Sequence, residues 1–126
     1  MTTTKTKPIN WDALASELTD IEIIRDPNQI IKLSLDYYHF SPILQSQLKD
    51  KKANLIVRPT NETEILQIAK TCVKYQAPLI VRGAGTGNYG QCIPLEGGVV
   101  LDTTKMNNIN SVKPGLSSVE IGRAHV

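Results

Sequence analysis

Residues 54–82 read NLIVRPTNETEILQIAKTCVKYQAPLIVR, and this stretch decides the fold. It opens with a short apolar run closed by a proline, which is typical of a buried strand that ends near Arg58. Residues 78–82 form a second run of the same kind. Between the two runs, apolar residues recur at spacings of three and four, as on the buried face of a helix: Ile65, Ile68, Ala69, Cys72 and Val73.

Two local signals mark the ends of this helix. Asn61 and Glu64 have capping-box spacing, so each side chain is expected to accept the backbone N–H of the other residue, and Pro78 ends the segment. Strand, helix and strand in this order form a βαβ unit, which predicts two parallel, neighbouring strands with a right-handed crossover. Residues 98–102, GVVLD, then predict a third strand.

Two further helices are predicted ahead of this unit. The first is capped by Asn10 and runs to Leu18. The second begins at Asp26 and Pro27, a typical pair of N-cap and first helical residue, and runs to about residue 36, where the stretch YYHFSP interrupts it. His39 in that stretch is interpreted as structural, because no second histidine or carboxylate stands at the spacing of a metal site. The expected fold class is α+β with an α/β-type βαβ core.

Composition excludes several classes of protein. The 126 residues suffice for one domain, and 40% apolar with 21% charged residues is typical of a globular chain. The net charge of +2 includes no basic block that would favour nucleic acid as a partner. No apolar run approaches the roughly 20 residues of a membrane span, and no secretory signal is recognisable, so we expect a cytoplasmic protein. Cys72 and Cys92 are too few for a disulfide framework or a zinc site. Both are interpreted as packing residues, with a redox role as the alternative for Cys92.

Residues 81–91 read VRGAGTGNYGQ and carry four glycines just after the second predicted strand. Gly85, Gly87 and Gly90 spell G-x-G-x-x-G, but a Rossmann fingerprint must open a helix. Pro94 and two further glycines follow here, so no helix fits. The segment is therefore predicted to be a different kind of loop at the ligand-binding edge of the sheet.

Residues 83–91, called the glycine loop below, have a composition suited to an anion. Glycine permits positive φ, which we expect at Gly85 and Gly87, so that successive N–H groups converge on a phosphate. Arg82 is expected to add positive potential at the entrance, while Thr86 supplies a neutral hydroxyl. No Lys-Ser or Lys-Thr pair follows, which excludes a Walker A site and nucleotide hydrolysis. A long exposed turn is the alternative interpretation.

Residues 54 to about 109 resemble the FAD-linked oxidases that share the fold of vanillyl-alcohol oxidase, p-cresol methylhydroxylase and the glycolate oxidase flavoprotein subunit. The resemblance rests on three motifs in order: VRPTNETEI, PLIVRGAGTGNYGQ and GGVVLDTTKMNNI. It implies the first lobe of a PCMH-type FAD-binding domain, preceded by N-terminal helices, with the FAD pyrophosphate held by backbone amides of the glycine loop. The candidate cofactor-binding residues are Pro59, Arg82, Gly83, Ala84, Gly85, Thr86, Gly87, Asn88, Tyr89, Gly90 and Gln91.

Covalent members of that family carry a histidine at the loop position that matches Thr86. A threonine hydroxyl is a poor nucleophile, so the resemblance implies non-covalent FAD. It further implies oxidation of a small-molecule substrate, a 2-hydroxy acid such as glycolate or D-lactate, by hydride transfer to the flavin. A flavoprotein similar to UDP-N-acetylenolpyruvoylglucosamine reductase and a non-catalytic interaction module remain as alternatives. The alternative redox role of Cys92, which follows the glycine loop, would then be linked to the flavin. Catalytic residues, electron acceptor and oligomeric state stay unassigned.

The C-terminal residues depart from this resemblance. Similar proteins continue after Val119 and Glu120 into a second FAD-contacting lobe and a substrate domain, whereas this sequence reads IGRAHV over residues 121–126. We therefore expect a partial FAD-binding domain over residues 51–126, truncated at its C-terminus, after the tail and helices of residues 1–50. We also expect the last six residues to be foreign to the native sequence, and the chain to be inactive alone.

Overall fold

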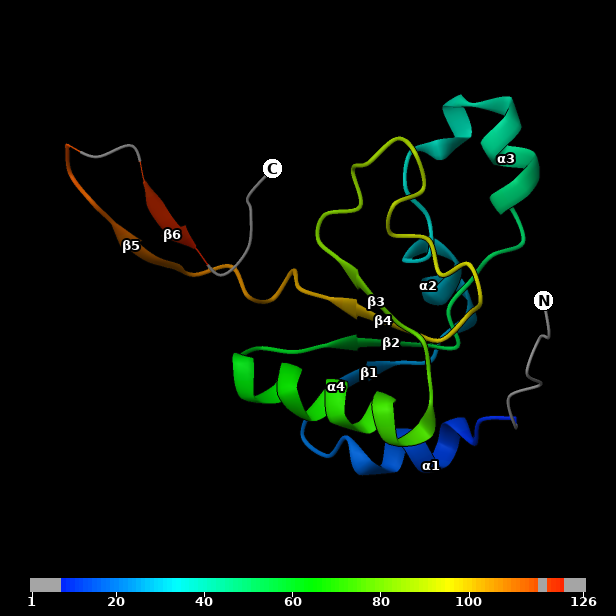
Figure 1. Cartoon of the computed structure of the whole chain (residues 1–126), viewed down its shortest axis with the longest axis horizontal. Helices are drawn as coiled ribbons and strands as arrows, with labels where there is room; N and C mark the ends of the chain where they lie inside the picture. The colour runs from blue at the N-terminus through cyan, green and yellow to red at the C-terminus, as the bar shows by residue number, and fades with distance from the viewer. Residues whose placement is uncertain (1–7, 116–117, 122–126) are drawn as a thin grey trace.

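The computed structural model describes residues 8–115 and 118–121. A four-stranded sheet with helices on both of its faces forms the main body, and a two-stranded hairpin projects from it (Figure 1). The elements in chain order are α1 (Trp11–Glu17), β1 (Glu22–Ile24), α2 (Pro27–Lys32), the 3-10 helix η1 (Tyr38–Phe40), α3 (Pro42–Leu48), β2 (Leu55–Arg58), α4 (Glu62–Tyr75), β3 (Leu79–Arg82), β4 (Val99–Asp102), β5 (Ile109–Val112) and β6 (Val119–Ile121).

The sheet has the strand order β1-β2-β4-β3. Strands β2, β4 and β3 are parallel, whereas β1 pairs with β2 in the antiparallel direction. The predicted βαβ unit is therefore present, but the prediction that its two strands are neighbours is wrong, because β4 lies between them. All four residues of β4 are buried, which suits a central strand. The prediction that residues 78–82 form a buried strand is wrong, because β3 is an edge strand in which only Arg82 is buried and Val81 is 62% exposed.

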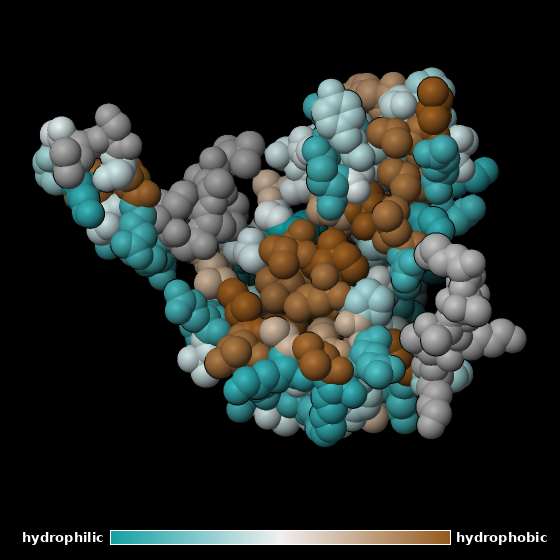
Figure 2. All heavy atoms as spheres, in the orientation of Figure 1, coloured by the Kyte–Doolittle hydropathy of each residue, from teal (hydrophilic) through white to brown (hydrophobic). Residues whose placement is uncertain are grey.

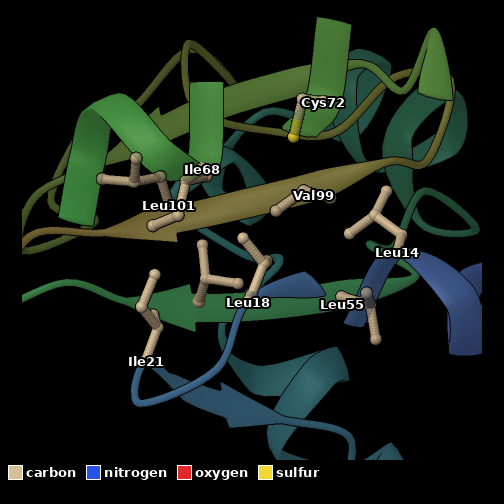
Figure 3. Close-up of a cluster of buried hydrophobic side chains, with 9 residues drawn as sticks. Leu14, Leu18, Ile21, Leu55, Ile68, Cys72, Val99 and Leu101 are labelled. Atoms are coloured by element: carbon tan, nitrogen blue, oxygen red, sulfur yellow. The ribbon is translucent and has the colours of Figure 1, made fainter. Parts of the chain in front are cut away.

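The main core lies between the sheet and helices α1 and α4. Because strand side chains alternate between the two faces, Leu55 and Val57 of β2 point towards these helices and Ile56 points towards α2 on the other face. Figure 3 shows the main cluster, which also includes Cys72 as expected. Its buried members are Leu14, Leu18, Ile21, Leu55, Val57, Ile68, Cys72, Val99 and Leu101. The prediction that Val73 shares this buried face is wrong, because Val73 is 78% exposed.

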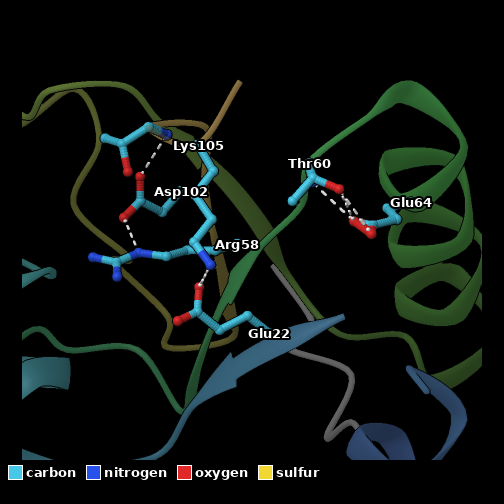
Figure 4. Close-up of polar contacts among 7 residues, drawn as sticks. Glu22, Arg58, Thr60, Glu64, Asp102 and Lys105 are labelled. Carbon is cyan, nitrogen blue, oxygen red and sulfur yellow. Dashed lines mark hydrogen bonds and ion pairs between the residues drawn. The ribbon is translucent and has the colours of Figure 1, made fainter. Parts of the chain in front are cut away.

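Helix α4 begins as predicted, with one residue of difference in its cap. The side chain of Asn61 accepts the N–H of Glu64 at 2.9 Å. The Glu64 carboxylate, however, accepts the N–H of Thr60 at 2.8 Å rather than that of Asn61, and it also accepts the Thr60 hydroxyl (Figure 4). The expected reciprocal box is thus shifted by one residue, because the hydroxyl of Thr60 offers the carboxylate an additional donor.

The N-terminal region contains more structure than predicted. Helix α1 is capped by Asn10 as expected, and α2 begins at Pro27 as expected but ends at Lys32 instead of residue 36. Beyond Lys32 the backbone tightens, with the N–H of Ser34 donating to the Ile31 carbonyl at 3.2 Å, and the Ser34 hydroxyl accepts the N–H of Ala53 at 2.9 Å. Residues 37–42, predicted to interrupt a helix, contain η1 and the start of α3. The prediction of two helices before the βαβ unit is therefore wrong, because α3 is an additional one.

The hairpin of β5 and β6 lies apart from the main sheet. It leaves Ile109, Val112 and Val119 more than half exposed. The expectation about the last six residues concerns Ile121, which ends β6, and residues 122–126. Residues 122–126 lie outside the described residues. None of the described helices is both long enough and apolar enough to cross a membrane.

Candidate cofactor-binding site

The glycine loop follows the carboxyl end of β3. Since β2, β4 and β3 are parallel, their carboxyl ends lie at the same end of the sheet. The last residues of these strands, Arg58, Asp102 and Arg82, therefore all lie there. This is the edge at which open α/β sheets bind their ligands. In the view of Figure 2, apolar residues gather over the middle of the sheet and hydrophilic residues surround them. The loop therefore has the position that the sequence predicts for a binding element.

The glycines of the loop have different conformations. Gly85 and Gly90 adopt φ of +70° and +77°, whereas Gly87 is not among the residues with positive φ, so the expectation for Gly87 is wrong. A Cβ atom at Gly85 would lie 2.0 Å from Nη2 of Arg82, while one at Gly83 would meet nothing within 4 Å. At Gly87 it would meet the flexible side chain of Gln91 at 2.6 Å. At Gly90 it would lie 2.7 Å from Cδ1 of Leu48, so Gly85 and Gly90, which both have positive φ, are the positions in the loop that require glycine.

The guanidinium of Arg82 lies beneath the loop rather than at its entrance. The residue is only 8% exposed, and Nη1 donates to the carbonyl of Leu35. Nη1 also lies 3.8 Å from Sγ of Cys92. Burial raises the pKa of the Cys92 thiol, and the nearby charge of Arg82 opposes that rise. Arg82 forms no ion pair with any carboxylate in the described part of the chain, although the buried Asp36 lines the same hollow.

Residues 36–38, from the N-terminal region, form hydrogen bonds with the loop. The Asp36 carboxylate accepts the N–H of Gly90 at 2.9 Å and the N–H of Tyr38 at 2.7 Å. The backbone N–H of Tyr37 donates to the carbonyl of Gly87 at 2.9 Å. Sequence reasoning missed Asp36; the local signal that could have found it is its position two residues before Tyr38, which is typical of an Asx turn.

Several polar groups of the loop have no hydrogen-bond partner in the described residues. The backbone N–H groups of residues 83–88 donate to no other described residue. The side chains of Thr86 and Asn88 are exposed, as is Tyr89, which is 75% exposed. The side-chain oxygen of Gln91 instead accepts the N–H of Tyr89 at 3.2 Å and so closes the end of the loop. The remaining candidate, Pro59, follows β2 at the same edge with a fully buried ring.

Two hollows lie at this edge of the protein. The first, of about 360 Å³, opens beside the glycine loop and is lined by Lys32, Leu33, Leu35, Asp36, Tyr37, Arg82, Ala84 and Gly85. The second, of about 330 Å³, lies between the start of α4 and the hairpin and is lined by Thr60, Asn61, Glu62, Met106, Asn108, Asn110 and Glu120. Only the first combines a buried cation with backbone of the glycine loop.

The other arginine at this edge is already neutralised. Nε of Arg58 lies 2.9 Å from Oδ2 of Asp102, a side chain that is 1% exposed (Figure 4). The second oxygen of Asp102 accepts the N–H of Thr104 at 2.9 Å. Lys105, just beyond β4, pairs with Glu22 of β1 at 2.7 Å. These contacts tie β1, β2 and the end of β4 together, so this cluster is structural and Arg82 is the cation that faces the loop.

Metal-binding side chains do not gather in the described residues. No group of three His, Cys, Asp or Glu side chains there could hold a metal ion. The ring of His39 packs against Phe40, with ring centroids 4.5 Å apart, and meets Tyr37 edge-on at 6.1 Å. His39 thus belongs to an aromatic cluster on η1.

Parts of this chain are similar in sequence to several curated proteins. Glycolate oxidase subunit GlcD of Escherichia coli (strain K12) is 29% identical over 105 residues, which cover 81% of this chain and 19% of the relative. D-lactate dehydrogenase of Archaeoglobus fulgidus is 38% identical over 55 residues, which cover 44% of this chain and 12% of the relative. The chain thus spans about a fifth, or less, of the length of the curated relatives it matches.

Solved structures show the same fold. A structure of alkyldihydroxyacetonephosphate synthase matches 84% of this chain with a TM-score of 0.70 and 21% identity, and covers 23% of that protein. p-Cresol methylhydroxylase with bound substrate matches 83% of the chain with a TM-score of 0.66 and 16% identity, covering 20% of that protein. The expected fold class, the helix-preceded βαβ core of a PCMH-type domain, is therefore confirmed. Residues 53–124 match the family described as FAD binding domain, and the chain belongs to this family, whose cofactor is FAD.

Proposed function

We propose that the glycine loop holds the pyrophosphate of FAD, and that this chain forms part of the cofactor site of a flavin-dependent oxidoreductase. One observation carries the proposal: the backbone N–H groups of residues 83–88 donate to no other described residue, and the buried guanidinium of Arg82, which forms no ion pair in the described residues, lies next to the loop at Gly85. Backbone amides and a guanidinium are the donors that bind phosphate oxygens best. A side chain at Gly85 would displace that guanidinium. Glycine at this position is therefore needed to keep the positive charge next to the loop.

The individual residues would divide the binding between them. Backbone amides along the loop, together with the exposed hydroxyl of Thr86 and the amide of Asn88, would donate to the pyrophosphate. Pro59 and Gln91 would shape the edge and close the loop without donating to the cofactor themselves. Because Thr86 offers only a hydroxyl where covalent proteins carry histidine, FAD would be bound non-covalently. We assign no catalytic residue.

The substrate would be a small 2-hydroxy acid such as glycolate or D-lactate. Bound FAD would supply the chemistry by accepting a hydride from the carbon that carries the hydroxyl. Curated relatives named glycolate oxidase and D-lactate dehydrogenase support this proposal over a reductase of the UDP-N-acetylenolpyruvoylglucosamine type. Residues 51–126 would provide the cofactor-binding part, and we propose that the 126-residue chain does not oxidise such acids by itself.

Titration calorimetry with three related ligands tests the binding proposal. FAD and ADP both carry the pyrophosphate, whereas riboflavin lacks it, so we expect FAD and ADP to bind the 126-residue chain and riboflavin to give no heat. Gly85→Val should remove binding of both. Gly115→Val is the matched control, since Gly115 has a similar φ of +77° but lies in the hairpin turn with nothing near its Cβ position. Binding of riboflavin as tight as that of FAD, or no binding of ADP and FAD, would refute the proposal.

A further inference from the structure

Residues 35–38 lie outside the part of the chain that matches the FAD binding domain family, which begins at residue 53. They nevertheless contact Arg82, just before the glycine loop, and the loop itself at Gly87 and Gly90. We propose that Asp36 is a positioning residue that, with the backbone of residues 35–38, fixes the glycine loop in its cofactor-binding conformation. The inference rests on the proposed function of the loop, but part of its test needs no ligand.

The Asp36 carboxylate joins the two segments through both of its oxygens. Oδ2 accepts the N–H of Gly90, a residue 54 positions away in the sequence, and Oδ1 accepts the N–H of Tyr38. The side chain is only 6% exposed. Charge-assisted hydrogen bonds of this kind are stronger than neutral ones, and a buried N–H that loses its acceptor carries a desolvation cost. Asp36 therefore holds the end of the loop firmly against η1.

Two backbone contacts complete the attachment. The carbonyl of Leu35 accepts a hydrogen bond from Nη1 of Arg82 just before the loop, and the N–H of Tyr37 donates to the carbonyl of Gly87 in its middle. None of these contacts uses an N–H group of residues 83–88, so these N–H groups have no acceptor in the described residues.

A loop held in this way would bind a pyrophosphate at lower cost. Ordering a flexible loop upon binding consumes part of the binding free energy, and a loop that is already ordered avoids that loss. The alternative is that Asp36 only caps the turn into η1 through Tyr38. The contact with Gly90 distinguishes the two roles, because capping η1 does not require it.

Amide hydrogen exchange in the ligand-free chain tests the positioning role directly. We would compare the parent with Asp36→Ala and Asp36→Asn, and use Asp20→Asn as a charge-matched control at an exposed site. We expect exchange at Gly90 to accelerate at least about tenfold in Asp36→Ala, while the amides of β2 and β4 and the whole Asp20→Asn variant match the parent. Unchanged exchange at Gly90, or equal acceleration in β2 and β4, would overturn the inference.

Titration with FAD adds the functional readout. Asp36→Ala should raise the Kd for FAD at least about tenfold, and Asp36→Asn should have an intermediate effect because one acceptor oxygen remains. Asp20→Asn should leave the Kd unchanged. If the parent binds FAD and Asp36→Ala binds it with the same Kd, the positioning role is refuted. If the parent chain does not bind FAD, the proposed function fails and the exchange experiment alone decides whether Asp36 orders the loop.

Discussion

Replacing Gly85 by alanine should destabilise the protein far more than the same change two residues earlier at Gly83. The new Cβ at Gly85 would lie 2.0 Å from Nη2 and 2.4 Å from Cζ of Arg82, and a residue with a side chain would have to keep φ near +70°. The left-handed conformation costs about 1–2 kcal/mol. Displacing the buried guanidinium from the Leu35 carbonyl costs about 1.5–3 kcal/mol more. We therefore expect the free energy of unfolding to fall by about 2.5–5 kcal/mol.

Gly83→Ala is the matched control, because its Cβ would meet nothing within 4 Å and its φ is not positive. Its effect should stay within about 0.5 kcal/mol. Urea denaturation followed by fluorescence of Trp11 measures both variants, since this is the single tryptophan and it packs against the main core. If Gly85→Ala were as stable as the parent, or Gly83→Ala as unstable as Gly85→Ala, the described loop geometry would be wrong.

Three further outcomes follow from the structure. Asp102→Asn should lower the free energy of unfolding by about 2–4 kcal/mol in urea, because it leaves the half-buried Arg58 without its partner; a loss below about 0.5 kcal/mol would contradict this. Burial raises the pKa of the Cys72 thiol to about 11, so in a Cys92→Ser variant Ellman's reagent at pH 8 should react only after unfolding, and rapid reaction of the folded protein would count against that burial. With threonine at position 86, acid precipitation of the FAD complex should leave the flavin in the supernatant rather than on the protein.

The βαβ unit could be predicted because its signals are local. The apolar spacing of α4, the proline after β2 and the cap at Asn61 each act within a few residues. The position of β4 between β2 and β3 could not be predicted in this way, because strand pairing depends on contacts distant in the sequence. The burial of all of β4 and the exposure of Val81 explain the order once the fold is known.

The glycine loop itself could be found from the sequence, but its support could not. Its four glycines and its place after a strand were visible, whereas Arg82 reaches Leu35 across 47 positions and Asp36 reaches Gly90 across 54. Periodic patterns in the sequence do not predict contacts between residues so far apart.

The prediction of positive φ at Gly87 was wrong, because glycine permits that conformation without requiring it.

Amide chemical-shift mapping with ADP tests the central claim most directly. Increasing ADP added to ¹⁵N-labelled protein should shift the amides of residues 83–88 first and most strongly, because these free N–H groups would take up the pyrophosphate. The amides of Thr60, Asn61, Asn108 and Asn110, around the second hollow, should move little. Shifts confined to that second hollow, with the glycine loop unchanged, would contradict the claim that the loop is the cofactor-binding element.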